Sequence, residues 1–352
     1  MGSVVRSRAC LTLVALGSLL ALASAQAQPS RVDTIANYAG ADRPAVLEAG
    51  AKREGALLLY TTGTQIKPLI DRFERKYPYV KVELARASSA DTARKVLEEY
   101  RAGYEKVDAF ELASHGLVLP RDENVLQPFQ SPEFAAFNRD AVEPGRHWVV
   151  VRESYTGIGF NTKLLPIEKA PKTYSDLLDP QWKGRMAISG VTTTAVNWVG
   201  TMAIVQGADF VRKLGQQDFR VYNLTGRALA NLISAGEILL SPTIYNSHVS
   251  TSSEKGAPLA WFAPGPVPVT DTGVAIARKA PHPHAAMLFI DFLMSKEGQI
   301  LYQGLGYDSP RTDAARPSAQ VQKLYLTNRP NYIADYENWA RLYQNVFVRR
   351  KM

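Results

Sequence analysis

The segment from residue 56 to residue 114 alternates between strand and helix patterns, and this alternation constrains the fold more than any other feature. "ALLLY" at 56–60 is a continuous apolar run of the kind found in buried parallel strands. A helical spacing of apolar side chains follows, then the alternating "VKVEL", a second helical stretch after "RASSAD", and a third strand in "KVDAFEL". Such a βαβαβ unit predicts a doubly wound, mostly parallel sheet flanked by helices, which is an α/β fold.

Small polar residues follow each strand of this unit. Ligands of doubly wound sheets bind beyond the carboxyl ends of the strands, and helix starts at Thr64 and near Ser89 would aim backbone N–H groups into the same crevice. Arg86 could pair with a ligand charge or could equally be a surface cation. The ligand-binding candidates in this half are Thr61, Thr62, Ser88 and Ser89, with Arg86 and Glu111 as secondary candidates.

Two stretches suit crossings between this half and a second lobe. "HWVVVRESYTGIGFN" at 147–161 predicts two β-rich runs joined by Tyr155 to Gly157, and "APGPVPVTDTGVAIAR" at 263–278 predicts the return. Tyr155 and Asp271 fall at these crossings, so they either contact the ligand as secondary candidates or only brace the hinge. We expect lobe 1 to comprise residues 28–146 and 272–310, lobe 2 to comprise 147–271, and 311–352 to form a helical tail that packs on the lobes.

The second lobe contains the threonine run "SGVTTTAVNW", in which Thr192, Thr193 and Thr194 precede a helical pattern. One threonine suffices to cap a helix, and a capped helix alone is the simplest interpretation. At the end of a strand, opposite the polar strand ends of the first lobe, the run instead predicts one side of an anion site. Tyr245 and Asn246, at the end of the strand after "SAGEI", complete the ligand-binding candidates.

The first 27 residues predict a cleavable secretory signal peptide. Arg6 and Arg8 precede an apolar run from Leu11 to Leu22, and small residues in an Ala-x-Ala arrangement follow it. The run is too short to span a bilayer as a stable helix. Cys10, the single cysteine, precedes the run, so the exported chain would have neither a disulfide nor a lipid-anchor cysteine. These features predict a periplasmic protein stabilised by an ordinary apolar core.

Composition and motifs argue against several other functions. The formal net charge is +8, but basic and acidic residues are interspersed, and no basic stripe with aromatics indicates a nucleic-acid surface. The sequence lacks a Gly-x-Ser-x-Gly elbow, a His-Glu-x-x-His motif and a glycine-rich phosphate loop, so an exported hydrolase has no motif support. His282 and His284 are a conceivable metal pair, but two ligands leave a metal site incomplete, and a solvated loop is the alternative. We therefore expect a monomer without catalytic residues, cofactor or metal.

The order of several segments resembles the periplasmic substrate-binding proteins of ABC transporters, in the branch that contains the ferric-ion binders and their organic-ligand relatives. The matching stretches are "TYSDLLDPQWKGRMAIS", "YTGIGFNTKLL", "SAGEI" and "GVAIARKAPHPHAAMLFIDFLMSKEGQILYQGLGYDSPR". The resemblance implies the type II periplasmic-binding-protein fold, with two α/β lobes that are joined by crossing strands and close on a ligand. It also implies three partners, namely a small-molecule ligand, an ABC permease and the ATPase of that permease at the inner membrane.

Iron and an organic anion are the alternative ligands that this resemblance leaves open. Ferric-ion binders of the group present adjacent tyrosines after the strand that follows the Gly-Glu-Ile segment, with histidine and glutamate from the first lobe. This sequence has Tyr245 alone, followed by Asn246 and Ser247, and no histidine after its first strand. A carboxylate, phosphonate or phosphate ester therefore fits the hydroxyl-rich loops better. The threonine run resembles the helix start that holds a synergistic anion in ferric binders, and Tyr245 would be a metal ligand only if the ferric alternative holds.

Overall fold

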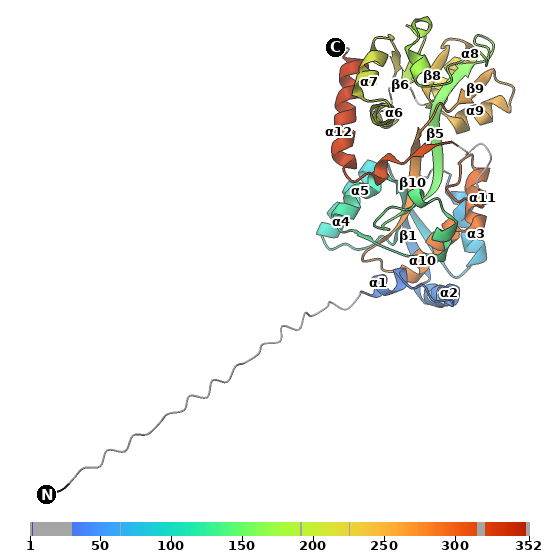
Figure 1. The fold of residues 1–352 in the computed structure, drawn as a ribbon. Helices are drawn as coiled ribbons and strands as arrows, with labels where there is room; N and C mark the ends of the chain where they lie inside the picture. Colours follow the sequence, from blue (N-terminus) through green and yellow to red (C-terminus); the bar gives the residue numbers. More distant parts are fainter. Residues whose placement is uncertain are drawn as a thin grey trace.

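Two lobes joined by long strands make up the part of the chain that the structure describes (Figure 1). The computed structural model describes residue 2 and residues 30–63, 65–190, 192–224, 226–314 and 321–349. Apart from residue 2, the predicted signal peptide lies outside these residues, as does the helix start predicted at Thr64. Within the described ranges, no helix combines the length and the apolar character that a membrane crossing requires.

Lobe 1 contains the predicted βαβαβ unit. Its elements are α1 (Arg31–Ala36), α2 (Arg43–Glu54), β1 (Ala56–Thr61), α3 (Lys67–Lys76), β2 (Lys81–Arg86), α4 (Ser89–Arg101), β3 (Ala109–Ala113), α5 (His115–Asp122), β4 (Leu126–Gln127), η1 (Pro132–Ala136), η2 (Arg139–Ala141), α10 (Pro283–Met294) and α11 (Lys296–Gly304). β1 pairs in parallel with β2 on one side and with β3 on the other. Because both of its edges are paired, the apolar run of β1 is largely buried, whereas β2 at the sheet edge is mostly exposed.

Lobe 2 is built on a second, smaller set of parallel strands. Its elements are η3 (Ser175–Leu178), η4 (Pro180–Trp182), β6 (Ala187–Ser189), α6 (Thr192–Val205), α7 (Ala208–Gly215), β7 (Arg220–Tyr222), α8 (Gly226–Ala235), β8 (Leu240–Tyr245), α9 (Asn246–Ser253) and β9 (Leu259–Phe262). β6 pairs in parallel with β7, and a parallel bridge between Met186 and Leu240 aligns β6 with β8. The carboxyl ends of these three strands therefore lie along one edge of the lobe.

Two antiparallel strands, β5 (Val149–Asn161) and β10 (Val267–Ala277), cross between the lobes. The prediction of two runs joined by Tyr155 to Gly157 is wrong, because β5 is one continuous strand of 13 residues. Tyr155 pairs with Val269 of β10, and the next residue already pairs with Tyr245 of β8. Consecutive residues at the junction are thus paired first with β10 and then with β8, so the backbone stays extended and forms no turn there.

The C-terminal tail returns across the hinge and packs on lobe 2. β11 (Lys323–Leu324) pairs with β10, and η6 (Leu326–Asn328) leads into α12 (Tyr332–Tyr343), which ends in the π-helical turn Gln344–Val348. α12 packs against α6 (Figure 1), so closely that a side chain at Gly200 would come within 2.5 Å of the Trp339 ring. The predicted lobe boundaries at 146/147 and 271/272 stay proposals, and they fall just before β5 and inside β10.

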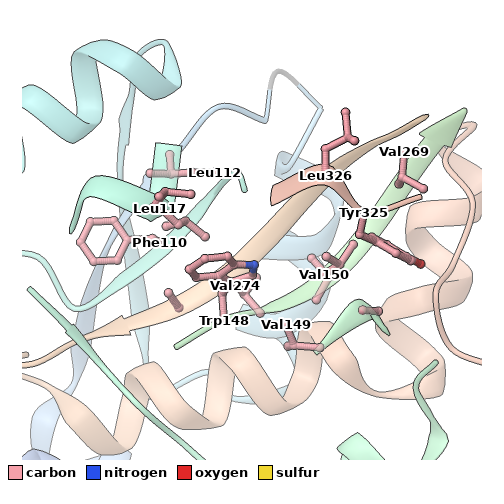
Figure 2. Close-up of a cluster of buried hydrophobic side chains, with 14 of the residues drawn as sticks. Phe110, Leu112, Leu117, Trp148, Val149, Val150, Val269, Val274, Tyr325 and Leu326 are labelled. Carbon is pink, nitrogen blue, oxygen red and sulfur yellow. The ribbon is translucent and has the colours of Figure 1, made fainter. Parts of the chain in front are cut away.

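The apolar core continues along the crossing strands from one lobe toward the other. Figure 2 shows buried side chains from β3, α5, β5, β10 and the tail segment before α12 gathered around these strands. The labelled members are Phe110, Leu112, Leu117, Trp148, Val149, Val150, Val269, Val274, Tyr325 and Leu326. Because the tail contributes the buried side chains of Tyr325 and Leu326, it is part of the apolar core around the crossing strands, which we call the hinge core.

Candidate functional site

The carboxyl ends of the strands in both lobes face the region between the lobes. β5 runs from lobe 1 into lobe 2 and β8 is antiparallel to it, so β8 and the parallel β6 and β7 run back toward lobe 1. β10 runs the opposite way, and its antiparallel partner β3, with β1 and β2, runs toward lobe 2. The loops and helix starts after these strands therefore meet between the lobes, where doubly wound sheets bind ligands.

Three helices begin at this edge of lobe 2. α6 begins at Thr192, α8 at Gly226 and α9 at Asn246, each within a few residues of the end of β6, β7 or β8. The first two loops are joined by a hydrogen bond from the Gly190 N–H to the Tyr222 carbonyl, with an N-to-O distance of 2.6 Å. The backbone N–H groups of a first helical turn lack intrahelical partners and carry partial positive charge, so this edge attracts anions.

A chain of three hydroxyl groups links the start of α6 to the crossing strand β10. The Thr194 Oγ1 lies 3.0 Å from the Tyr245 hydroxyl oxygen, which lies 3.0 Å from the Thr270 Oγ1. Each of the three hydroxyls has one hydrogen, and the two hydrogen bonds of the chain use two of these hydrogens. The third hydrogen can be donated to a further acceptor. We call the three helix starts and this hydroxyl chain the interlobe site.

The other two members of the threonine run lie at the same helix start. The side chain of Thr192 lies outside the described part of the structure. Thr193 is half-buried beside Tyr336 of α12. Burial raises the pKa of Tyr336, and the Thr193 side chain opposes this effect. Thr193 therefore contacts the tail helix, and Thr194 is the member of the run that enters the hydroxyl chain.

The two faces of the crossing strands carry different side chains. Ser154 pairs with Thr270, and Arg152 pairs with Thr272. Facing residues of an antiparallel pair project on the same side, and residues two apart share a face. These four residues therefore form one face of the crossing strands, and its members Arg152, Ser154 and Thr270 are only half-buried. This half-buried face meets the hydroxyl chain at Thr270.

The opposite face of the crossing strands is buried under the tail. The Glu153 carboxylate accepts hydrogen bonds from the hydroxyls of Tyr155 at 2.6 Å and Tyr325 at 2.5 Å, and it pairs with the Lys323 Nζ at 2.7 Å. Asp271 accepts from the Thr327 hydroxyl, and burial raises the pKa of Asp271 to about 6. This placement of Tyr155 and Asp271 favours the alternative that they brace the hinge.

Asn246 connects the two lobes. Its Oδ1 accepts a hydrogen bond from the Tyr155 backbone N–H at 3.0 Å, and its Nδ2 donates to Asp308 Oδ2 at 2.5 Å. Asp308 in turn forms an antiparallel backbone bridge with Glu153. The amide of Asn246 is thus oriented by the hinge, although it opens α9 at the interlobe site.

In lobe 1, Glu111 is the centre of a buried hydrogen-bond cluster. Its carboxylate accepts from the Thr61 hydroxyl at 2.5 Å and from Arg152 Nε at 2.7 Å. Thr61 also accepts the Gly63 N–H at 2.8 Å, and the Thr62 N–H donates to the Glu111 carbonyl at 3.0 Å. Thr61 and Glu111 therefore contact each other and Arg152, and Thr62 lies half-buried at the same strand end.

The candidates after β2 lie apart from this cluster. Ser88 is the exposed N-cap of α4, and its Oγ accepts the Asp91 N–H at 3.1 Å. Ser89 is buried against Gly116, where an added Cβ would lie 2.6 Å from the Ser89 Cβ. Arg86 is exposed at the end of the edge strand. The structure thus gives Ser88 a capping role and Ser89 a packing role.

The sequence matches a known family from the start of α5 to the start of α12. The model of the family described as "Bacterial extracellular solute-binding protein" matches residues 114–332, which is more than half of the chain. The chain belongs to this family. An uncharacterised protein of Haemophilus influenzae is 26% identical over 278 residues. The aligned region covers 72% of the present chain and 77% of that relative.

Solved structures confirm the α/β periplasmic-binding-protein fold. Iron-bound HitA from Pseudomonas aeruginosa has a TM-score of 0.68 at 19% identity, and the match covers 83% of the present chain and 99% of HitA. FutA from Trichodesmium with iron and citrate has a TM-score of 0.72 at 17% identity, with coverage of 83% and 99%. AfuA from Actinobacillus pleuropneumoniae with fructose-6-phosphate has a TM-score of 0.65 at 22% identity, with coverage of 84% and 99%. At these identities the likeness extends to the fold alone.

The half-buried face of the crossing strands was not predicted from the sequence of the solute-binding protein. The sequence analysis places three members of this face, Arg152, Ser154 and Thr270, in the crossing segments and assigns them no binding role. The alternation of "RESY" at 152–155 and "VTDT" at 269–272 carried the signal, because it puts Arg152 and Ser154 on one side and Glu153 and Tyr155 on the other.

The two histidines considered as a metal pair have separate carboxylate partners. His282 Nδ1 lies 3.0 Å from Asp108 Oδ2, whereas His284 Nδ1 lies 2.7 Å from Glu54 Oε1. Across the residues that the structure describes, no group of three or more His, Cys, Asp or Glu side chains could hold a metal ion. These histidines therefore take part in two different, partly buried contacts of lobe 1.

His248 lies beside the interlobe site and makes stability depend on pH. Its ring centroid is 5.2 Å from that of Tyr245. Burial, and then the charge of Arg227, lower the pKa of His248 to about 4. Between that pH and roughly 6.5, the ordinary value, the unfolded chain binds a proton that the folded chain excludes. Stability is therefore lost as pH falls through this window, by on the order of 1 to 3 kcal/mol.

His248→Gln should remove this acid sensitivity. We expect the urea midpoint of the variant to fall less than that of the wild type between pH 7 and pH 4.5. Asp271 acts in the opposite sense because its pKa is raised, but it is present in both proteins, so the difference between them isolates His248. Equal falls in the two midpoints would contradict the prediction.

Proposed function

We propose that this chain is the solute-binding component of an ABC import system, which captures a small anionic organic solute in the periplasm and delivers it to a membrane permease and its ATPase. The observation that carries this proposal is the start of three helices at one edge of lobe 2, where the hydroxyls of Thr194 and Tyr245 form a chain with that of Thr270. Helix N-termini bind carboxylate and phosphate groups through backbone N–H donors and the helix dipole. The family assignment supports the role of solute binding.

Such a role needs a conformational change, and we expect it to occur at the hinge between the lobes. Two crossing strands and the tail connect the lobes, and Asn246 joins them through side-chain hydrogen bonds. A solute that contacts both lobes favours the closed form by the difference between its contacts in the closed and open forms. Closure then signals to the permease that the solute is bound.

The solute class is a carboxylate, a phosphonate or a phosphate ester. Each of these offers several oxygen acceptors, which match the backbone N–H groups and hydroxyls of the interlobe site. AfuA, which has the same fold, holds fructose-6-phosphate in its structure, and this phosphate ester supports the proposed class.

Ferric ion is the alternative cargo, because HitA and FutA hold iron in their structures. Here Tyr245 is a single tyrosine whose hydroxyl already contacts two threonines. If iron were bound through Tyr245, ferric citrate would produce a visible tyrosinate-to-iron absorption band that Tyr245→Phe abolishes. A colourless mixture without bound iron would reject this alternative.

A thermal-shift panel tests the proposed function. The exported chain would be heated with carboxylates, phosphonates, sugar phosphates, polyamines and ferric citrate, because a ligand that binds only the folded state raises the apparent melting temperature. We expect at least one organic anion to stabilise the protein, by about 2.7 kcal/mol at a hundredfold excess over its Kd. Stabilisation by polyamines alone would contradict the proposal.

A further inference from the structure

Arg152 lies on the half-buried face of the crossing strands, and the described residues engage only part of its guanidinium. Its Nε donates to Glu111 Oε1 at 2.7 Å, and its Cζ lies 4.5 Å from the centre of the Tyr307 ring. Its side chain is 13% exposed. A guanidinium has five N–H donors, and among the described residues no second hydrogen bond to it is formed. The four Nη hydrogens at the half-buried face of β5 thus have no partner among the described residues.

The guanidinium is held in one orientation before a ligand binds. Glu111 is fully buried and also accepts from the hydroxyls of Thr61 and Tyr302, so its carboxylate is fixed. Burial lowers the pKa of Arg152, but the Glu111 carboxylate outweighs burial and raises it, so Arg152 keeps its charge. Glu111 thus holds one edge of the Arg152 guanidinium, and Tyr307 covers one of its faces. The two Nη groups therefore form a preorganised fork for a planar or tetrahedral oxyanion.

Arg152 and the hydroxyl chain belong to different ends of the region between the lobes. The crevice beside Arg152 is lined by residues of lobe 1, among them Gly63, Gln65 and Tyr307, and it is too narrow for a water molecule, so a ligand group must approach the Nη atoms from the space between the lobes. Along the crossing strands, Arg152 is two residues from the pair of Ser154 and Thr270, which is about 7 Å. The hydroxyl chain then leads away into lobe 2. A single carboxylate or phosphate group is too small to contact both Arg152 and the start of α6.

We propose that Arg152 binds a second anionic group of the solute, so that the solute carries a carboxylate or phosphate at each of two ends. This inference rests on the proposed function, since it extends the same interlobe site. The first anionic group binds at the helix starts of lobe 2, and the second binds the Arg152 fork in lobe 1. A solute with both groups contacts both lobes and favours closure.

Titration calorimetry with matched pairs of probes tests this proposal. The pairs are succinate with butyrate, 3-phosphoglycerate with glycerol 3-phosphate, and fructose 1,6-bisphosphate with fructose 6-phosphate, so that the arms separate carboxylate from phosphate at the second position. The wild type is expected to bind the member with two anionic groups at least about tenfold tighter in one or more pairs, as one charged hydrogen-bonded contact implies. Arg152→Met should lose this preference.

Arg75→Met is the matched control, because it removes an exposed cation from the last turn of α3 in the same lobe and should keep the preference. If Arg152→Met fails to fold, Arg152→Lys retains the charge without the fork, and it should lose most of the preference. A wild type that binds anions but prefers no doubly anionic probe would overturn this inference and leave the proposed function intact. A preference that survives in the Arg152 variants would also overturn it. A wild type that binds no anion would remove both.

Discussion

Glu153→Ala is expected to lower the free energy of unfolding by about 3 to 5 kcal/mol, the usual effect of removing one partner of a buried ion pair. The Glu153 side chain is fully buried and that of Lys323 is 11% exposed. Without the carboxylate, the Lys323 ammonium and the hydroxyls of Tyr155 and Tyr325 lose their common acceptor inside the hinge core. Urea denaturation of the exported chain, followed by circular dichroism, measures the effect.

Two further variants separate the loss of a partner from the loss of the side chain. The double variant Glu153→Met with Lys323→Met removes both charges and should recover much of the stability, because apolar replacements of buried pairs are often neutral. Glu83→Ala removes an exposed carboxylate from the edge strand β2 and should change stability by less than about 0.5 kcal/mol. If Glu153→Ala behaved like Glu83→Ala, the hinge core would not depend on this ion pair.

Thr194→Val should weaken binding of the best anion from the thermal-shift panel by roughly 10- to 100-fold, since a hydrogen bond to a charged group contributes about 1.5 to 3 kcal/mol. The substitution keeps the shape of the side chain and removes the hydroxyl that contacts Tyr245 at the start of α6. Calorimetry gives the Kd, and urea denaturation of the empty protein gives the stability. We expect the change in binding to exceed the change in stability.

Thr201→Val is the matched control on the same helix. Thr201 is fully buried, and its hydroxyl donates to the Asn197 carbonyl within α6, away from the hydroxyl chain. It should alter stability without altering the Kd. Equal effects of the two substitutions on binding would argue that Thr194 only caps or packs the helix.

The local patterns of the sequence predicted the first lobe because periodicity is a property of neighbouring residues. The apolar run of β1 and the helical spacing in α3 belong to segments of about ten residues and need no distant partner to be recognised. The prediction of two runs in place of the single strand β5 is wrong because the continuity of this strand depends on distant partners. Its middle is held by Val269 and Tyr245, which are about a hundred residues away and could not be paired with it from the sequence alone.

The candidate site shows the same limit. Thr194 and Tyr245 were singled out by residue type and position, but their contact with each other, and with Thr270, depends on tertiary structure. The sequence does not indicate Arg152 as a binding residue, because its proposed role depends on Glu111, a partner on another strand, and on the donors that Glu111 does not engage. The position of Ser89 after a strand indicates a ligand-binding residue, and only its packing against Gly116 shows that it is buried.

Mass spectrometry of the small molecules released when the freshly purified protein is denatured tests the central proposal most directly. The interlobe site predicts an organic anion with at least one carboxylate or phosphate group, released by the wild type and depleted in Thr194→Val. A polyamine or a ferric ion as the released ligand would contradict it.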